Sequence, residues 1–295
     1  MTPRPFKEHE PIGSGFEDVL TAIADENKPT IAQAVARPFL KWAGGKRSIL
    51  AELTARLPKE YGAYCEPFLG GGALYFSTKP EKAYLSDVNF PLILTFQAVR
   101  DDVDRLITNL KVHEGKHNKE YYLQARQRFG REKDPTKVAA LLIYLNKTCY
   151  NGLYRVNREG VFNVPIGDYE TPAILDEDNL RAASNALQHA EIKQHPFSGV
   201  PVKKGNFYYL DPPYHKTFDG YDSSRFGDDD HKQLATFCKG LDKAGCYFMV
   251  SNSDTSLVRS LYVGFKIEKV MASRFVSCKP QTRGKESELV IRNYE

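Results

Sequence analysis

Cysteine is sparse in this 295-residue chain: there are five cysteines, an odd number, and no Cys-x-x-Cys occurs. That pattern excludes a disulfide framework and a zinc ribbon and is typical of reduced thiols in a cytosolic protein. Long apolar runs are also lacking, since no stretch approaches the roughly 20 residues of a membrane span. The acidic N-terminal segment has no continuous apolar stretch, which excludes a secretory signal and a typical transit peptide. We therefore expect a cytoplasmic protein with no membrane partner.

Positive charge is concentrated in one window, although the net charge of the chain is only +4. Residues 111–160 contain eleven Lys or Arg and five acidic side chains, which gives that window a net charge of +6. A polyanionic partner such as nucleic acid would explain the excess. A solvated helical face is the alternative, and charge alone does not separate the two.

Short apolar segments alternate with helical patterns from residue 38 onward. Strands are predicted at 61–66, 83–87, 192–195, 207–211, 246–251, 265–270 and 288–292. Helices are predicted near 45–57, 72–78, 90–99, 228–243 and 254–261. This alternation predicts an α/β fold, namely a mostly parallel seven-stranded sheet with helices on both faces.

The pattern changes between residues 101 and 189, where helical periodicity dominates. Helices are predicted at 103–112, 120–129 and 138–145, and a polar, glycine-bearing stretch follows over 146–172. We interpret 101–189 as a helical insertion that coincides with the basic window. It divides an α/β domain into residues 37–100 and 190–295. Residues 1–36, Pro-rich and acidic, form an N-terminal extension that is either flexible or a docking helix.

The segment Tyr-Tyr-Leu-Asp-Pro-Pro-Tyr at 208–214 carries the clearest chemical signal. A buried strand ends there in the carboxylate of Asp211, and Pro212 and Pro213 cannot continue a sheet. Tyr214 adds a flat stacking surface. Because ligands bind at the carboxyl edge of open α/β sheets, the motif predicts a site that holds a planar ring and orients its amino group. A Pro-rich turn after a strand is the alternative.

A glycine-rich turn follows the first predicted strand and opens a helix. Glu66 ends that strand, and glycines at 70–72 allow a ligand to approach the backbone closely. Glu66 favours a ligand with a positive group, whereas Asp87, which ends the second strand, suits ribose hydroxyls. The spacing is not the phosphate fingerprint Gly-x-Gly-x-x-Gly. Together these features predict a nucleoside-type cofactor that is not held chiefly by phosphates.

The segment Phe-Leu-Lys-Trp-Ala-Gly-Gly-Lys at 39–46 superficially suggests a phosphate loop. The pattern Gly-x-x-x-x-Gly-Lys-Ser/Thr needs glycine at position 40 and Ser or Thr at 47, where Leu40 and Arg47 stand. A nucleotide triphosphatase is excluded on that ground. Trp42, the only tryptophan, either packs in the core or walls a small-molecule pocket in which Lys46 pairs with a carboxylate.

Seven motifs in one order carry a family resemblance. They are Phe-Leu-Lys-Trp-Ala-Gly-Gly-Lys (39–46), Glu-Pro-Phe-Leu-Gly-Gly-Gly (66–72), Ser-Asp-Val-Asn (86–89), Tyr-Asn-Gly-Leu-Tyr-Arg (150–155), Phe-Asn-Val-Pro-Ile-Gly-Asp-Tyr (162–169), Asp-Pro-Pro-Tyr (211–214) and Val-Ser-Asn (250–252). The set resembles the Dam-type DNA adenine-N6 methyltransferases of the D12 class, with the α-group motif order, over residues 37–295. The resemblance implies a class I S-adenosyl-methionine-dependent methyltransferase fold in a cytoplasmic enzyme encoded by a bacterium or phage.

The same resemblance implies a cofactor, a partner and roles for single residues. S-adenosyl-methionine would be surrounded by Trp42, Lys46, Glu66, Phe68, Gly70, Gly72 and Asp211, with Asp87 on its ribose. Double-stranded DNA would be the partner and no metal would be needed; the enzyme would be a monomer, with a dimer on DNA as the alternative. The target adenine would be flipped out of the duplex, because its amino group is otherwise paired and stacked.

Catalysis would then rest on the motif at 211–214. Tyr214 would stack on the flipped ring, while the Asp211 carboxylate and the Pro212 carbonyl, held by the stiff Pro212–Pro213 pair, would accept the two amino hydrogens. The amino lone pair would then face the methyl donor, so that catalysis is positioning for an in-line displacement.

The insertion would be the target-recognition domain. Arg155 would make a bidentate guanine contact and Lys41 would contact the first guanine, which together imply the site GATC. Tyr150 or Leu153 would enter the space left by the flipped base, and Asn151 lies in the same DNA-facing turn. After the catalytic motif, Phe218, Tyr221 and Phe226 resemble a loop that closes over target and cofactor, although packing is the alternative for them.

Several alternatives stay open at this point. A cytosine-C5 enzyme is excluded because no Pro-Cys dipeptide occurs. A cytosine-N4 enzyme, in which Ser more often replaces Asp211, a DNA-binding homologue without catalysis, and a protein-amide methyltransferase remain. The chain departs from the family pattern at Asp168, where a basic residue is expected, and around 277–282, which leaves the roles of Arg274 and Arg283 open.

Overall fold

The computed structural model describes residues 35–157, 159–215, 226–273 and 285–295. Residues 35–295 form one compact unit. All but the last two residues of the predicted N-terminal extension lie outside the described part of the chain, as do Phe218 and Tyr221 of the predicted loop, and Arg274 and Arg283.

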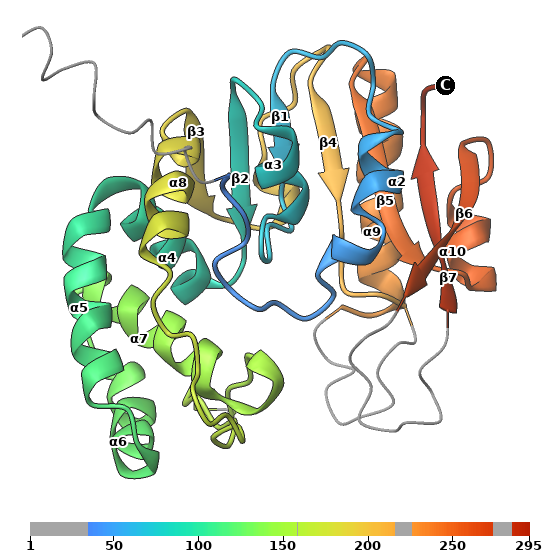
Figure 1. Ribbon diagram of the computed structural model, residues 1–295. Helices are drawn as coiled ribbons and strands as arrows, with labels where there is room; N and C mark the ends of the chain where they lie inside the picture. The colour runs from blue at the N-terminus through green and yellow to red at the C-terminus, as the bar shows by residue number, and fades with distance from the viewer. Residues whose placement is uncertain (1–34, 158, 216–225, 274–284) are drawn as a thin grey trace, which may run out of the picture. The chain divides into compact units, whose positions relative to one another are not determined.

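A seven-stranded sheet organises this unit (Figure 1). Its strands are β1 (Tyr64–Glu66), β2 (Ala83–Asp87), β3 (Ala190–Gln194), β4 (Phe207–Leu210), β5 (Tyr247–Ser253), β6 (Lys266–Ser273) and β7 (Lys285–Arg292). They follow the order β3-β2-β1-β4-β5-β7-β6, and only β7 runs antiparallel to its neighbours. The predicted α/β class, with a seven-stranded and mostly parallel sheet, is confirmed, and each predicted strand is present with ends shifted by a few residues.

Strand β4 lies at the centre of the sheet, and this position explains why its sequence is an unbroken apolar run. All four of its residues are buried, and alternate side chains enter opposite cores. Phe207 and Tyr209 join one core, whereas Tyr208 and Leu210 join the other. The predicted helices on both faces are therefore confirmed.

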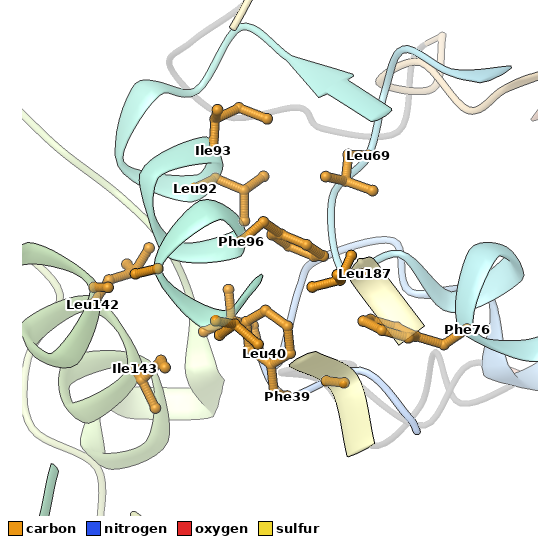
Figure 2. Packing of buried hydrophobic residues seen from close by; sticks show 14 of the residues in the cluster. Phe39, Leu40, Leu69, Phe76, Leu92, Ile93, Phe96, Leu142, Ile143 and Leu187 are labelled. Atoms are coloured by element: carbon orange, nitrogen blue, oxygen red, sulfur yellow. The ribbon is translucent and has the colours of Figure 1, made fainter. Parts of the chain in front are cut away.

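Each core is closed by its own helices. The first contains residues of α2 (Leu50–Thr54), α3 (Ala73–Thr78), α4 (Phe90–Asp101) and α8 (Glu177–Leu187), and the second contains residues of α9 (Asp228–Lys243) and α10 (Ser256–Leu261). Figure 2 shows the first core, where Phe96 of α4 lies beside Phe39 with ring centroids 4.8 Å apart. Phe76 of α3 stacks on the same Phe96 ring at 6.2 Å.

Three helices follow α4 and extend the first core. They are α5 (Val103–Gly115), α6 (Lys119–Phe129) and α7 (Pro135–Thr148). Helix α7 packs against α4, α5 and α6, which explains why nearly every one of its residues is buried. Asn118 and Asp134 cap the starts of α6 and α7 by accepting backbone N–H bonds, as polar residues at these positions commonly do.

The helix predictions needed two changes. The predicted helix at 45–57 is two short elements, η1 (Lys46–Ser48) and α2, separated by Ile49 in a non-helical conformation. The sequence patterns also singled out no helix at 177–187, where α8 lies. Its signal was present, because Asp176 caps the helix and Leu180, Ala183 and Leu187 repeat at helical spacing on its buried side.

Candidate active site

Three carboxylates lie at the carboxyl ends of three adjacent strands. Glu66 ends β1, Asp87 ends β2, and Asp211 directly follows β4. Because β2, β1 and β4 are neighbours and parallel, their ends meet at one edge of the sheet. That edge is where open α/β sheets bind ligands, so the structure brings together the acidic residues that the sequence placed there separately.

Lys46 and Asp211 form a buried ion pair at this edge. The Lys46 Nζ atom lies 2.7 Å from Asp211 Oδ2, and the lysine side chain is only 7% exposed. The same Nζ donates to the carbonyl of Gly44 at 2.5 Å. The other carboxylate oxygen, Asp211 Oδ1, is buried and has no hydrogen-bond partner within the described residues. A buried acceptor without a partner is costly unless a ligand uses it.

Burial governs the ionisation of both inner carboxylates. It raises the pKa of Asp211 to about 6, although the Lys46 ammonium opposes the shift. It raises the pKa of Glu66 to about 8; the Tyr64 hydroxyl, which donates to Glu66 Oε2 at 2.8 Å, opposes this rise, and the nearby Asp211 charge adds to it. Near neutral pH the site therefore holds one ionised carboxylate beside a lysine and a second that is largely protonated.

The glycine-rich turn packs against Trp42. Gly70 has φ +48°, and a Cβ atom there would lie 2.9 Å from Trp42 Cδ1. The Gly70 amide donates to Asp87 Oδ2 at 3.2 Å, and the Asn89 amide donates to Asp87 Oδ1 at 2.9 Å. Trp42 stacks on Tyr154 with ring centroids 5.4 Å apart. This tryptophan therefore joins the turn to the segment after α7 and is not sealed in the core.

Gly72 and Phe68 mark the two ends of this turn. Gly72, with φ +65°, is the residue that precedes α3. Phe68 packs away from Trp42, on Phe197 at 5.5 Å and on Phe226 at 5.8 Å. Phe226 is the one aromatic of the predicted closing loop that lies within the described residues.

Two apolar side chains next to Asp87 are exposed. Val88 is 67% exposed and Phe90 is 52% exposed, directly after the strand-end carboxylate. Neither was among the predicted site residues, although their place after a strand-end Asp was the available signal. They offer an apolar surface beside the acceptor that was predicted to hold a ribose.

The Asp-Pro-Pro-Tyr motif at 211–214 follows β4 and has no regular secondary structure. Pro212 is buried, Pro213 is exposed and Tyr214 is half-buried. The Tyr214 hydroxyl donates to Glu288 Oε2 at 2.6 Å, and the Lys46 Nζ atom lies 4.8 Å from the centre of the Tyr214 ring. Glu288 was not among the predicted site residues, since nothing in its local sequence marks it.

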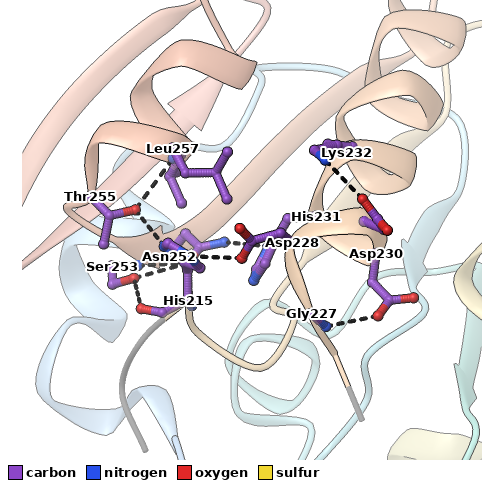
Figure 3. Close-up of polar contacts among 12 residues, drawn as sticks. His215, Gly227, Asp228, Asp230, His231, Lys232, Asn252, Ser253, Thr255 and Leu257 are labelled. Carbon is purple, nitrogen blue, oxygen red and sulfur yellow. Dashed lines mark hydrogen bonds and ion pairs between the residues drawn. The ribbon is translucent and has the colours of Figure 1, made fainter. Parts of the chain in front are cut away.

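A polar network holds the peptide that follows Tyr214 (Figure 3). The amide of His215 donates to Asn252 Oδ1 at 3.2 Å, and the Ser253 hydroxyl donates to the His215 carbonyl at 2.6 Å. The His215 ring lies between Thr255 Oγ1, 2.8 Å from Nδ1, and Asp228 Oδ1, 3.1 Å from Nε2. The Val-Ser-Asn motif at 250–252 thus has a structural role beside the Asp-Pro-Pro-Tyr motif, because its Asn252 holds the chain after it.

Lys41 meets the turn after α7. Asn146 Nδ2 donates to the carbonyls of Lys41 at 2.7 Å and Gly152 at 2.9 Å, and Asn146 Oδ1 accepts from the Lys41 amide at 2.8 Å. A Cβ atom at Gly152 would lie 2.6 Å from the Lys41 side chain. The Lys41 Nζ atom lies 4.5 Å from the centre of the Tyr169 ring. Asn146 was missed in the sequence because its partners are far apart along the chain.

The remaining residues predicted to contact DNA surround that turn, η2 (Tyr150–Gly152). Tyr150 is 43% exposed, and Asn151 is exposed with φ +53°. Leu153 is half-buried against the first core. Arg155 is exposed, and its guanidinium donates to Asn163 Oδ1 at 2.7 Å and to the Asn163 carbonyl at 3.1 Å.

The described part of the chain contains neither a metal-binding cluster nor a helix that could span a membrane. Among the residues that the structure describes, no three His, Cys, Asp or Glu side chains are grouped to hold a metal ion. No helix in the same part of the chain has the length and apolar character needed to cross a bilayer. The four described cysteines are buried and unpaired.

Comparison with known proteins adds an independent finding. A family model described as D12 class N6 adenine-specific DNA methyltransferase matches residues 42–275. The chain is 43% identical over 288 residues to the type II methyltransferase M.MjaIII of Methanocaldococcus jannaschii, covering 88% of this chain and 99% of that protein. It is 33% identical over 265 residues to the DNA adenine methylase of Haemophilus influenzae, covering 86% of this chain and 92% of that protein. The DNA adenine methylase of Escherichia coli K12 is also 33% identical over 265 residues, covering 86% and 94%.

Proposed function

The chain belongs to the D12 class N6 adenine-specific DNA methyltransferase family, and we propose that it transfers the methyl group of S-adenosyl-methionine to N6 of an adenine in duplex DNA. The observation that carries this proposal is Asp211 Oδ1, a buried acceptor without a partner among the described residues. An amino hydrogen of a substrate would satisfy it. Because its neighbour Oδ2 is held by Lys46 at 2.7 Å, the carboxylate is oriented before a substrate arrives.

The residues at the sheet edge fit the chemistry of the proposed cofactor. S-adenosyl-methionine supplies an electrophilic methyl group on a sulfonium, and it also carries an ammonium, a carboxylate and a ribose. Glu66 would take the ammonium, Lys46 the carboxylate and Asp87 the ribose hydroxyls. Trp42, Gly70 and Gly72 would form the wall beside it, and Phe68 would support the turn. The exposed apolar surface of Val88 and Phe90 would lie against the adenine ring of the cofactor.

Asp211 and its neighbours would then hold the target amine. The Asp211 carboxylate and the Pro212 carbonyl would each accept one hydrogen bond from the amino group. This arrangement favours a pyramidal nitrogen with its lone pair directed away from both acceptors. Pro213 would stiffen that turn, and Tyr214 would stack on the extruded base. Catalysis would come from orientation and from electrostatic stabilisation of the positive charge that develops on the nitrogen.

The segment over 101–189 would act as the target-recognition domain between catalytic segments 37–100 and 190–295. Its basic residues would neutralise phosphates. Lys41 and Arg155 would read guanines, which supports GATC as the recognition site. Tyr150, exposed beside them, would enter the space left by the flipped base, with Asn151 in the same turn and Leu153 supporting it from the core side.

Methyl transfer from tritiated S-adenosyl-methionine to short duplexes tests the proposal. We expect label in duplexes that contain GATC and no label once the adenine is replaced by another base. Digestion of the product and chromatography of the nucleosides should give N6-methyladenine. Recovery of N4-methylcytosine, or no label in any duplex, would reject the proposal in favour of the cytosine enzyme or the inactive homologue.

A further inference from the structure

Glu288 is a carboxylate of the active-site face that no motif revealed. It lies on β7, the one antiparallel strand, where it pairs with Ser253 of β5 and Val270 of β6. Side chains alternate along a strand, and Val290, two residues further along, belongs to the same core as Tyr209 and Met249. Glu288 therefore projects from the face of the sheet that also carries Glu66 and Asp211.

The side chain of Tyr214 ends on this carboxylate. Its hydroxyl donates to Glu288 Oε2 at 2.6 Å, across 74 residues of sequence. A short bond to a carboxylate is of the charge-assisted type, which is stronger and more directional than a bond between neutral groups. The Tyr214 oxygen lies on the axis of the Cβ–Cγ bond, so anchoring it at Glu288 fixes the direction in which the side chain points. Because a phenolic O–H lies close to the plane of its ring, the direction of the acceptor also biases rotation of the ring about that axis.

The main chain of the same segment is held independently. Asn252 and Ser253 at the end of β5 bind the amide and the carbonyl of His215 at 3.2 Å and 2.6 Å. Ser253 is also the cross-strand partner of Glu288. Two neighbouring strands thus hold Tyr214 at two points, because β5 fixes the backbone next to it and β7 fixes the tip of its side chain.

From this arrangement we infer that Glu288 is a positioning residue, which holds the Tyr214 ring in place so that an extruded base stacks with its amine at Asp211. The inference rests on the proposed function, since it assigns Tyr214 the stacking role. It predicts that removal of the Glu288 carboxylate impairs methyl transfer without impairing cofactor binding. In this role Glu288 would contact neither substrate nor cofactor.

The test is a set of variants measured on the intact enzyme. Glu288→Ala removes the acceptor, Glu288→Gln keeps an acceptor without the charge, and Tyr214→Phe removes the donor but keeps the ring. The matched control is Glu191→Ala, because Glu191 is an exposed carboxylate on β3 paired with Lys193. For each variant, kcat and the KM for cofactor are measured by tritiated methyl transfer. Base extrusion is followed by fluorescence of a duplex with 2-aminopurine in place of the adenine that the wild type methylates.

We expect Glu288→Ala to lower kcat by about tenfold to a hundredfold, as loss of a charged hydrogen bond predicts, with the KM for cofactor nearly unchanged. The 2-aminopurine signal should differ from that of the wild type, and Glu288→Gln should recover part of both effects. Tyr214→Phe should resemble Glu288→Ala, and the double variant should lose no more than the worse single variant, because both act through one bond. The control should retain wild-type values.

The inference would be overturned if Glu288→Ala and Tyr214→Phe act independently of each other. If Glu288→Ala lowers kcat by the same factor in the Tyr214→Phe background, or leaves kcat and fluorescence unchanged, Glu288 does not act through Tyr214. If Glu288→Ala fails to fold, Tyr214→Phe and Glu288→Gln decide: wild-type values for both reject the inference, and matching losses support it. A wild-type enzyme that does not methylate adenine would reject the proposed function itself. An active wild type whose Glu288→Ala variant keeps wild-type kcat and fluorescence would reject only the role of Glu288.

Discussion

Replacing Asp211 with alanine tests the central carboxylate of the site. Its Oδ1 atom is buried without a partner in the described part of the chain, and we expect it to accept a hydrogen bond from the target amine. Losing one preorganised charge-stabilising group from a water-excluded site typically costs about 2.7–4 kcal/mol, or about 10²–10³ in kcat. Asp211→Asn keeps an acceptor oxygen but loses the charge, so its activity should lie between those of the wild type and Asp211→Ala.

The same change has a calculable effect on stability. Lys46, 7% exposed, loses its counter-charge, and breaking a buried pair costs about 3–5 kcal/mol. Against this, burial raises the pKa of Asp211 from 3.8 to about 6, which at about 1.36 kcal/mol per pKa unit corresponds to about 3 kcal/mol. A raised pKa in the folded state favours the protonated form, so above about pH 6 the ionised Asp211 destabilises the native protein by that amount. Removing Asp211 relieves that cost, so the free energy of unfolding of Asp211→Ala at pH 7 should fall by less than about 3 kcal/mol, the low end of the range for a broken buried pair.

The assay combines single-turnover methyl transfer with urea unfolding. Asp211→Ala should lose transfer while it still binds S-adenosyl-methionine at least in part, and adding Lys46→Met should recover stability but not activity. The exposed Glu191→Ala variant controls for loss of a carboxylate elsewhere on the sheet. Turnover of Asp211→Ala within tenfold of the wild type would refute the assigned role. A fall of more than about 3 kcal/mol in the free energy of unfolding would refute this balance between the lost ion pair and the relieved burial of charge.

Glu66, Arg155 and Gly152 each give a further expected outcome. Burial raises the pKa of Glu66 to about 8, and a bound ammonium needs the ionised form, so cofactor affinity should rise as pH increases from 6 to 8. Titration calorimetry on Glu66→Gln should show a flatter pH dependence of that affinity. An unchanged slope would contradict the role of Glu66. Arg155→Ala should relax specificity at one base pair by roughly 1–3 kcal/mol, measured as the ratio of kcat/KM on cognate and substituted duplexes, and an unaltered ratio would reject that contact. Gly152→Ala places a Cβ atom 2.6 Å from the Lys41 side chain at a φ of +64°. The variant should therefore bind DNA more weakly in a fluorescence-anisotropy titration, with its cofactor affinity unchanged. Equal losses of both affinities would point to general misfolding.

Much of the fold was predictable because it is encoded locally. The run Phe207–Leu210 is apolar at every position, as a strand buried on both faces must be, and Asp211 with two prolines marks where it stops. Glu66 and Asp87 were likewise recognisable as strand-end acids. Parallel connectivity then brings such ends to one sheet edge, so the meeting of Glu66 and Asp87 at that edge followed from the order of elements alone.

The predicted helix boundaries that were wrong lie where tertiary contacts override the local sequence pattern. The predicted helix at 45–57 is interrupted at Ile49, and Lys46 at its start is turned into the site, where it pairs with Asp211. No helical periodicity encodes such a contact, because the two residues belong to different elements. Helix α8 was passed over although its spacing and cap were visible.

The sequence by itself identified the groups that this protein carries: a strand-end carboxylate before two prolines, a glycine-rich turn after another acid, and a basic segment rich in helical periodicity. Only the tertiary structure decided how those groups are held. It pairs Lys46 with one oxygen of Asp211, buries the other oxygen without a partner among the described residues, and ties Tyr214 to Glu288 across the sheet. The physical reason is that composition and periodicity report which face of an element is buried, whereas hydrogen bonds between distant segments depend on the register of strands that meet only in the folded chain.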